Sequence, residues 1–221
     1  MIATEQELLT PTEAAVVSHV SVRNVNRAID EKLLPENLFA VGRDGARQVS
    51  ADACIFISFY FEAANRLTSE ERLRIIATAS KQLPEAQVCA LEKEWIIRQE
   101  FLAIDLAPFL RSARQRLEKL SAARELVVED PEILSGTPVI RGTRVPAYDI
   151  AALAAAGEPT DHILEDYPSI TAEAVELATL YAEANPLQGR PQRSRTLPAG
   201  AVIVAHYSVP TNHAVIQKLA S

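Results

Sequence analysis

Residues 130–146, with the sequence DPEILSGTPVIRGTRVP, constrain the fold of this chain more than any other segment. Glycine adopts left-handed backbone angles without steric cost, so Gly136 and Gly142 predict tight turns. The short runs Val139–Ile140 and Arg144–Val145 flank the second glycine and predict the two strands of a small β-hairpin. We therefore expect this segment to form two turns and a hairpin.

Three short helices are predicted directly after this hairpin. Pro146 suits a helix start, where the N–H that proline lacks is not needed. The expected helices cover residues 147–156, 160–166 and 171–185, and each ends at a glycine or just before a proline. A hairpin followed by three short helices predicts a compact module similar to a helix-turn-helix.

These motifs carry a resemblance. The run DPEILSGTPVIRGTRVPAYDI and the later run EDYPSITAEAVELATLYA resemble the domain of unknown function 433 (DUF433) family, over Val127–Ala184. The resemblance implies a VapB-type antitoxin, which silences a PIN-like ribonuclease toxin and represses its own operon. The matching motif residues are Gly136, Pro138, Arg141, Gly142, Thr143, Arg144 and Pro146. The alternative is that the glycines and prolines among them only fold the hairpin.

The N-terminal residues predict two helices joined by a short turn. Thr10-Pro11 opens the first helix, which continues to about Val17. Ser21 caps the second helix, which covers residues 22–33. The buried stripe of this second helix is expected to consist of Val22, Val25 and Ile29.

The opposite face of the second helix is polar, and a hairpin with an Asp44-Gly45 turn follows it. In the major groove arginine binds guanine and asparagine binds adenine, and either can bind phosphate. The candidate DNA-binding residues are Arg23, Asn24, Asn26, Arg27, Arg43 and Arg47. The pattern predicts a winged helix-turn-helix and resembles the N-terminal domain of MerR-type regulators. A small helical module with a solvated polar face is the other interpretation.

The middle of the chain predicts helices and one strand. Residues 50–67 are apolar on nearly every side, which favours a buried helix, although a strand over 55–61 stays open. Thr68-Ser-Glu-Glu71 is a capping box that opens a helix to about Gln82. A strand is expected over residues 95–104.

A longer helix is expected after Asp105, which would cap it, with Pro108 in its first turn. Its apolar stripe consists of Leu106, Leu110, Ala113, Leu117 and Leu120. This stripe suits either a dimer helix or packing on the protein's own core, and core packing is the favoured use. The outer face is basic, with Arg111, Arg114, Arg116 and Lys119, and suits DNA or plain solvent.

Charge is distributed unevenly along the chain, whose formal net charge is −7. Residues 125–185 hold two Lys/Arg and twelve Asp/Glu, whereas residues 186–221 hold four Lys/Arg and no acidic residue. The last helix of the acidic module carries Glu173, Glu176 and Glu183, which a phosphate backbone would repel. DNA reading is therefore assigned to the N-terminal residues and assembly to the acidic module. Arg141 and Arg144 suit either a phosphate contact or an internal pair with an acidic neighbour. The internal pair is favoured, and its candidates are Asp130, Glu132 and Asp149.

The C-terminal residues predict a flexible basic tail that becomes ordered on a partner. PIN-like ribonucleases hold a metal with clustered carboxylates, and an arginine placed there would replace the charge of the metal. The candidate toxin-binding residues are Arg190, Arg193, Arg195, Val202, Val204 and Tyr207. The alternatives are a loose tail on the protein surface and a basic arm on DNA.

Catalytic motifs and metal-ligand spacings are absent from the sequence, so we expect no enzyme activity, cofactor or metal. The two cysteines, Cys54 and Cys89, form no Cys-x-x-Cys pair and predict reduced residues. The run 53–61 is too short to cross a membrane, and the first ten residues show no signal sequence. These features predict a soluble cytoplasmic protein without a membrane partner.

The expected fold is mainly α, with an N-terminal winged helix-turn-helix, a C-terminal hairpin and three-helix module, and a flexible tail. The expected domains are 1–67 for DNA reading, 68–124 for a connector with the dimer helix, 125–185 for the antitoxin-family module, and 186–221 for the toxin-binding tail. The expected function is that of an antitoxin and operon repressor, which forms a homodimer and larger complexes with the toxin. The alternatives are a MerR-like regulator whose C-terminal half senses a ligand, and an interaction module that does not bind DNA.

Overall fold

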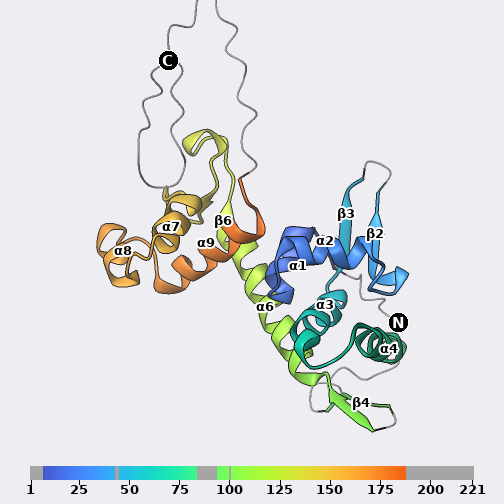
Figure 1. Cartoon of the computed structure of the whole chain (residues 1–221). Coiled ribbons are helices and arrows are strands. Elements are labelled where there is room, and N and C mark those ends of the chain that lie inside the picture. The colour runs from blue at the N-terminus through green and yellow to red at the C-terminus, as the bar shows by residue number, and fades with distance from the viewer. Residues whose placement is uncertain (1–6, 43–44, 84–93, 100, 188–221) are drawn as a thin grey trace, which may run out of the picture. The chain divides into compact units, whose positions relative to one another are not determined.

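The computed structural model describes residues 7–42, 45–83, 94–99 and 101–187 (Figure 1). The described residues are mainly helical, as predicted, with three small antiparallel sheets. Residues up to Pro186 belong to one compact unit, and Leu187 begins a second. All but Leu187 of that second unit lie outside the described residues.

Two capped helices follow the first strand. β1 (Leu8–Leu9) leads into α1 (Pro11–Ser18), whose N-cap Thr10 forms a reciprocal capping box with Glu13. α2 (Val22–Asp30) begins after Ser21, whose hydroxyl accepts a hydrogen bond from the Asn24 amide at 3.2 Å. α2 ends three residues earlier than expected, because the chain leaves the helix at Glu31 and then takes a positive φ.

A three-stranded antiparallel sheet follows these helices. The 3₁₀ helix η1 (Glu36–Leu38) precedes β2 (Phe39–Val41), which pairs with β3 (Arg47–Ser50). β1 pairs with the other edge of β3, so the strand order is β1-β3-β2. Gly45 has a φ of +80°, as the predicted turn requires, whereas Asp44 lies outside the described residues.

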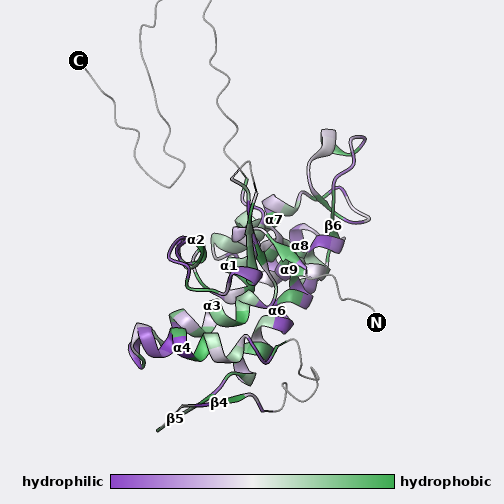
Figure 2. Cartoon of the chain, turned by 90° about the vertical axis from the view of Figure 1, so that its right-hand side faces the viewer, coloured by the Kyte–Doolittle hydropathy of each residue, from purple (hydrophilic) through white to green (hydrophobic). Residues whose placement is uncertain are grey.

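The apolar run in the middle of the chain is helical, and the strand interpretation is wrong. α3 (Ala53–Glu62) begins later than expected because Ser50 belongs to β3, and the short 3₁₀ helix η2 (Ala63–Asn65) follows it. Residues 53–60 are all buried, and Figure 2 colours much of α3 as hydrophobic. α4 (Ser69–Ala79) has the predicted capping box at Thr68.

The single strand expected over residues 95–104 is wrong, because two strands form there. β4 (Ile96–Gln99) and β5 (Leu102–Asp105) pair as an antiparallel hairpin. The turn contains Phe101, which is fully exposed. A hairpin rather than one strand allows the two short strands to satisfy each other's backbone hydrogen bonds.

The long helix is α6 (Ala107–Leu126), and its N-cap is Leu106 rather than Asp105. Asp105 still contributes, because its Oδ1 accepts a hydrogen bond from the Ala107 amide at 2.9 Å. The predicted stripe belongs to the protein's own core: Leu106, Leu110, Ala113 and Leu120 are buried, and Leu117 packs against them. This face of α6 is therefore occupied within the chain.

The C-terminal module has the three predicted helices but a different strand pairing. β6 (Val127–Val128) pairs with β7 (Val139–Ile140), so the expected strand over residues 144–145 is wrong. The chain still turns back after β7, because the Ile140 amide donates to the Val145 carbonyl at 2.9 Å. The 3₁₀ helix η3 (Leu134–Gly136) lies between β6 and β7.

The three helices of this module are α7 (Ala147–Ala155), α8 (Thr160–Asp166) and α9 (Ala172–Ala184). α9 packs on α7 and α6 and also on α1. One core cluster spans Leu9 to Leu120 and includes Ala184 from the end of α9, and a second cluster lies between Val127 and Ala178. The end of α9 is therefore shared with the N-terminal core.

Cys54 is buried in the first core and should resist alkylation. Burial raises the pKa of its thiol from 9.0 to about 12. Since the unfolded thiol ionises first, its contribution to stability is complete below pH 9 and is lost as the pH rises toward 12. In a Cys89→Ser chain at pH 8, we expect iodoacetamide to modify Cys54 on the order of a thousandfold more slowly than in urea. Equal rates in buffer and urea would contradict this burial.

Candidate nucleic-acid interface

The polar face of α2 is exposed, as the sequence predicts. Seven residues line a shallow depression along it: Ser21, Arg23, Asn24, Asn26, Arg27, Asp30 and Glu31. The opposite face of the helix is buried through Val25, Ala28 and Ile29. α1 packs against α2, so the first helix supports the second from behind.

Val22 does not belong to the buried stripe, in contrast to the sequence prediction. Its side chain is 37% exposed at the first position of α2. Ala28 is buried instead, because it lies three residues after Val25 and next to Ile29 on the covered side of the helix. Val22 lines a depression that also contains Glu176 and Glu183 of α9.

Arg23 and Asn24 follow Val22 in the first turn of α2. Arg23 is exposed and Asn24 is half-buried. Among the residues that the structure describes, no hydrogen bond or ion pair engages the side chain of either one. Both groups are therefore available to a ligand at the N-terminal end of the helix.

Arg47 joins β3 to α2, and its predicted contact with DNA stays a prediction. Its Nη1 donates to the Asn26 Oδ1 at 2.9 Å, and its Nη2 forms an ion pair with Asp30 at 2.8 Å. These bonds fix the sheet to the exposed face of α2. Asn26 and Arg47 thus position the helix and the hairpin relative to each other.

Arg27 is held along α2 by its own neighbour. Its Nε donates to the Glu31 Oε1 at 2.9 Å, one helical turn away. This hydrogen bond and the charge of Glu31 raise the pKa of Arg27. Its terminal guanidinium nitrogens still face solvent and can bind a phosphate. Arg43, the last predicted member of this set, lies outside the described residues.

The motif residues at the C-terminal turn serve the local backbone. Gly136 and Gly142 have φ angles of +82° and +76°, a left-handed conformation that explains why both positions are occupied by glycine. The Thr143 hydroxyl donates to the Ile140 carbonyl at 2.8 Å and accepts from the Val145 amide. The Pro138 carbonyl accepts from the Ala147 amide, and Pro146 caps α7.

The two arginines of this motif do not form the expected acidic pairs among the described residues. Arg141 instead donates from Nε to the Glu125 carbonyl at 2.8 Å, near the end of α6. This bond satisfies a carbonyl that the helix itself leaves without a donor. Arg144 is exposed, and no carboxylate in the described part of the chain pairs with it. The guanidinium of Arg144 therefore stays available to a partner.

On the acidic face of α9, Glu176 forms an ion pair with Lys119 of α6. Lys119 belongs to the predicted basic outer face of α6, and Arg116 lines the same depression as Glu176 and Glu183. The basic face is therefore partly neutralised by α9. Its use for DNA stays a prediction.

Arg124 forms an ion-pair cluster that sequence periodicity does not indicate. At the end of α6, its Nη1 contacts the Glu7 Oε1 at 2.6 Å and its Nη2 contacts the Glu13 Oε1 at 2.7 Å. Glu13 also accepts from the Thr10 amide through its other oxygen, at 2.8 Å. Burial lowers the pKa of Arg124, but its hydrogen bonds to Glu13 and Glu7 outweigh the effect of burial and raise the pKa overall. The cluster joins the last turn of α6 to the cap of α1.

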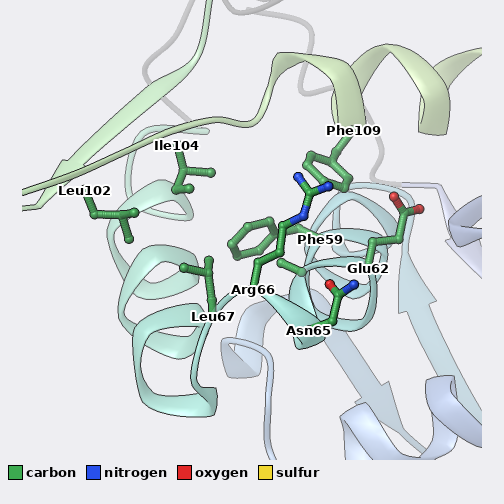
Figure 3. Close-up of a pocket in the computed structure, with 9 residues that line it drawn as sticks. Phe59, Glu62, Asn65, Arg66, Leu67, Leu102, Ile104 and Phe109 are labelled. Carbon is green, nitrogen blue, oxygen red and sulfur yellow. The ribbon is translucent and has the colours of Figure 1, made fainter.

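An apolar pocket of about 520 Å³ lies between α3, η2, β5 and the start of α6 (Figure 3). Its walls are Phe59, Leu67, Leu102, Ile104 and Phe109, and its rim carries Glu62, Asn65 and Arg66. The Phe59 and Phe109 rings meet edge to face with centroids 5.6 Å apart.

The predicted toxin-binding residues lie outside the described part of the chain. They are Arg190, Arg193, Arg195, Val202, Val204 and Tyr207. Among the residues that the structure describes, no cluster of histidine, cysteine or carboxylate side chains could hold a metal ion. The helices searched in the same ranges include none that is long and apolar enough to cross a membrane.

Comparison with known proteins places the C-terminal module in a family without an assigned role. Residues 127–182 match the family described as "Protein of unknown function (DUF433)". A relative from Sinorhizobium fredii, "Uncharacterized protein y4eO", is 53% identical over 203 residues, which are 90% of this chain and 91% of the relative. The solved structure of Rv2018 from Mycobacterium tuberculosis covers 76% of this chain and 95% of its own, with 16% identity and a TM-score of 0.32. A score at this level does not establish a shared fold.

Proposed function

The chain belongs to the family of the Sinorhizobium fredii protein y4eO and contains a DUF433 domain, and we propose that it is a DNA-binding antitoxin that represses its own operon. In this proposal the N-terminal residues form a winged helix-turn-helix, with α2 as the recognition helix and the β2–β3 hairpin as the wing. The DUF433 module and the tail bind and inhibit a PIN-like ribonuclease.

The exposed first turn of α2 is the observation that carries the DNA-binding part. Recognition helices contact base edges mainly through their N-terminal residues, and Arg23 and Asn24 occupy that position with unengaged side chains. The Arg47 bonds to Asn26 and Asp30 hold the proposed wing against this helix. Arg27 adds a cation for phosphate.

The antitoxin part rests on the DUF433 motifs and on charge. The tail carries four cations and no carboxylate, and PIN-like ribonucleases concentrate carboxylates around their catalytic metal. An arginine of the tail would enter that site, with Val202, Val204 and Tyr207 as apolar anchors. A homodimer joined by toxin into larger particles would bind a repeated operator with increased avidity.

Two measurements on the full chain test the two parts separately. For DNA, the full chain is titrated onto the duplex directly upstream of its own coding sequence and onto a scrambled duplex of equal length. For the toxin, the full chain and a chain truncated after Asn185 are used to capture partners from the native host. Capture of a small ribonuclease by the full chain alone supports the proposal, whereas capture by both moves the docking site to the module. If neither chain captures a ribonuclease, the proposed antitoxin function is contradicted.

The pocket of Figure 3 favours a second candidate, a regulator that responds to a small ligand. Its aromatic and aliphatic walls suit an apolar ligand body, and Arg66 suits a carboxylate at the rim. The residues that line this pocket lie between Phe59 and Phe109, whereas a ligand-sensing site was expected in the C-terminal half of the chain. We expect that an aromatic carboxylate such as phenylacetate would raise Tm in the wild type but not in an Arg66→Ala chain, if this candidate holds. Equal melting with and without the compound argues against this second candidate.

A further inference from the structure

The tip of the β4–β5 hairpin presents an aromatic side chain to solvent. Phe101 is fully exposed there, and the hairpin extends beyond the helices in both Figure 1 and Figure 2. Single apolar residues are common on protein surfaces, so the exposure of Phe101 carries no argument by itself. Its exposure gains a meaning from the pocket that begins directly beside it.

The strand that follows Phe101 forms one wall of the apolar pocket in Figure 3. Leu102 and Ile104 of β5 line this pocket together with Phe59 and Phe109. An apolar cavity of about 150 Å³ is large enough to bind benzene. The pocket volume of about 520 Å³ therefore leaves room for a phenylalanine ring. The chain's own Phe101 does not fill the pocket, because that side chain is fully exposed.

The charges beside Phe101 and at the pocket rim are complementary. Arg98 is exposed on β4, three residues before Phe101, and Glu62 is exposed at the rim. Within the described part of the chain, no ion pair engages either side chain, and the Glu62 carboxylate accepts a hydrogen bond from the Ser58 hydroxyl. A Phe101 ring that enters the pocket from a second copy would bring Arg98 toward this carboxylate. The charge pattern therefore favours a second copy of the chain as the occupant.

We propose that two copies form a two-fold dimer in which Phe101 of each copy enters the apolar pocket of the other. Because the ring and one pocket wall belong to the same hairpin, the exchange occurs twice, as a closed isologous interface requires. The apolar stripe of α6 does not compete for this role, since it packs on the protein's own core. The inference rests on the homodimer of the proposed function and names its surface, but it needs neither DNA nor a toxin.

The area of this exchange sets the expected strength of the dimer. One phenylalanine ring buries about 150–250 Å². If the walls that receive it lose a similar area, two insertions bury roughly 600–1,000 Å² in total, which is typical of transient complexes. We therefore expect a reversible dimer with a dissociation constant in the micromolar range.

Sedimentation velocity of the full chain over micromolar concentrations, without DNA, is the first test. The wild type should dimerise reversibly, and Phe101→Ser should weaken the dimer by at least about a hundredfold, because each dimer loses two buried rings. Urea unfolding of the Phe101→Ser chain should match that of the wild type, since the side chain is exposed. Leu134→Ser is the matched control, because Leu134 is exposed on a different part of the chain, and it should dimerise like the wild type.

A charge exchange tests whether the ring enters the pocket. Arg98→Glu and Glu62→Arg should each weaken the dimer about threefold to tenfold. The double variant should recover the wild-type affinity, because the two charges meet only between copies. A wild type that stays monomeric, a Phe101→Ser chain that still dimerises, or a double variant weaker than both single ones would each overturn the inference. None of these results bears on operator binding, which the duplex titration measures separately.

Discussion

Replacing Arg23 with alanine is expected to weaken binding to the operator duplex upstream of the coding sequence by about tenfold to a hundredfold, which corresponds to the loss of one bidentate contact with a base. Arg23 is exposed and has no partner among the described residues, so its loss should leave the free energy of unfolding unchanged within about 0.5 kcal/mol. Fluorescence anisotropy with labelled duplexes measures the first quantity, and urea unfolding measures the second.

An Arg74→Ala chain is the control for this experiment, because Arg74 is an exposed arginine on α4 that pairs with Glu70. It removes the same charge from a different helix and should retain operator binding. Binding to a scrambled duplex should fall much less than operator binding in Arg23→Ala, because phosphate contacts dominate non-specific affinity. Equal losses on both duplexes would make Arg23 a phosphate contact only.

Arg47 differs from Arg23 because it acts through other residues. Its bonds to Asn26 and Asp30 orient the hairpin, so an Arg47→Ala chain should lose affinity for the operator and also melt at a lower temperature. The combination of both effects distinguishes a positioning residue from one that contacts DNA directly. An unchanged melting temperature would contradict the positioning role.

Helix ends with strong local signals could be predicted from the sequence. The predicted cap at Thr10 and the predicted capping box at Thr68 are present, and α8 begins and ends at the predicted residues. These signals succeed because a cap uses side chains within three residues of the helix start, and a proline or glycine acts on its own backbone. Such features depend little on the rest of the fold.

Strand partners could not be predicted in the same way. Val139–Ile140 forms its two-residue ladder with Val127–Val128, and an isolated bridge between Val139 and Pro146 joins it to the residues just after the turn. The β4–β5 hairpin was missed because its turn around Phe101 lacks the usual glycine or asparagine. A short strand can satisfy its backbone groups with several neighbours, and tertiary packing decides among them.

The sequence predicted the exposed polar surface of α2 but not the hydrogen bonds that join α2 to the β2–β3 hairpin. Helical periodicity indicated that the face with Arg23 and Asn24 is exposed. It counted Val22 among the buried residues, whereas Val22 is 37% exposed, because the first residue of a helix is covered less than those in later turns. The bond between Arg47 and Asn26 joins residues 21 positions apart, and no local pattern encodes such a pair.

The cluster around Arg124 gives the second large prediction, a loss of about 2–4 kcal/mol in the free energy of unfolding for an Arg124→Met chain. The Glu13 side chain is only 10% exposed, so removing its cation leaves a nearly buried carboxylate without charge compensation. Methionine keeps most of the side-chain volume, so the loss reports on charge and hydrogen bonds rather than on a cavity. Urea unfolding of the full chain measures the change.

A matched variant separates this effect from that of an ordinary surface pair. The Arg74 and Glu70 side chains are 57% and 81% exposed, so Arg74→Met should cost less than about 1 kcal/mol. Adding Glu13→Gln to Arg124→Met should recover part of the loss, because a neutral amide does not need the cation. If Arg124→Met and Arg74→Met cost the same, the cluster is no stronger than a surface contact. A large difference would mean that the end of α6 is fixed to the cap of α1, the helix that supports α2 from behind.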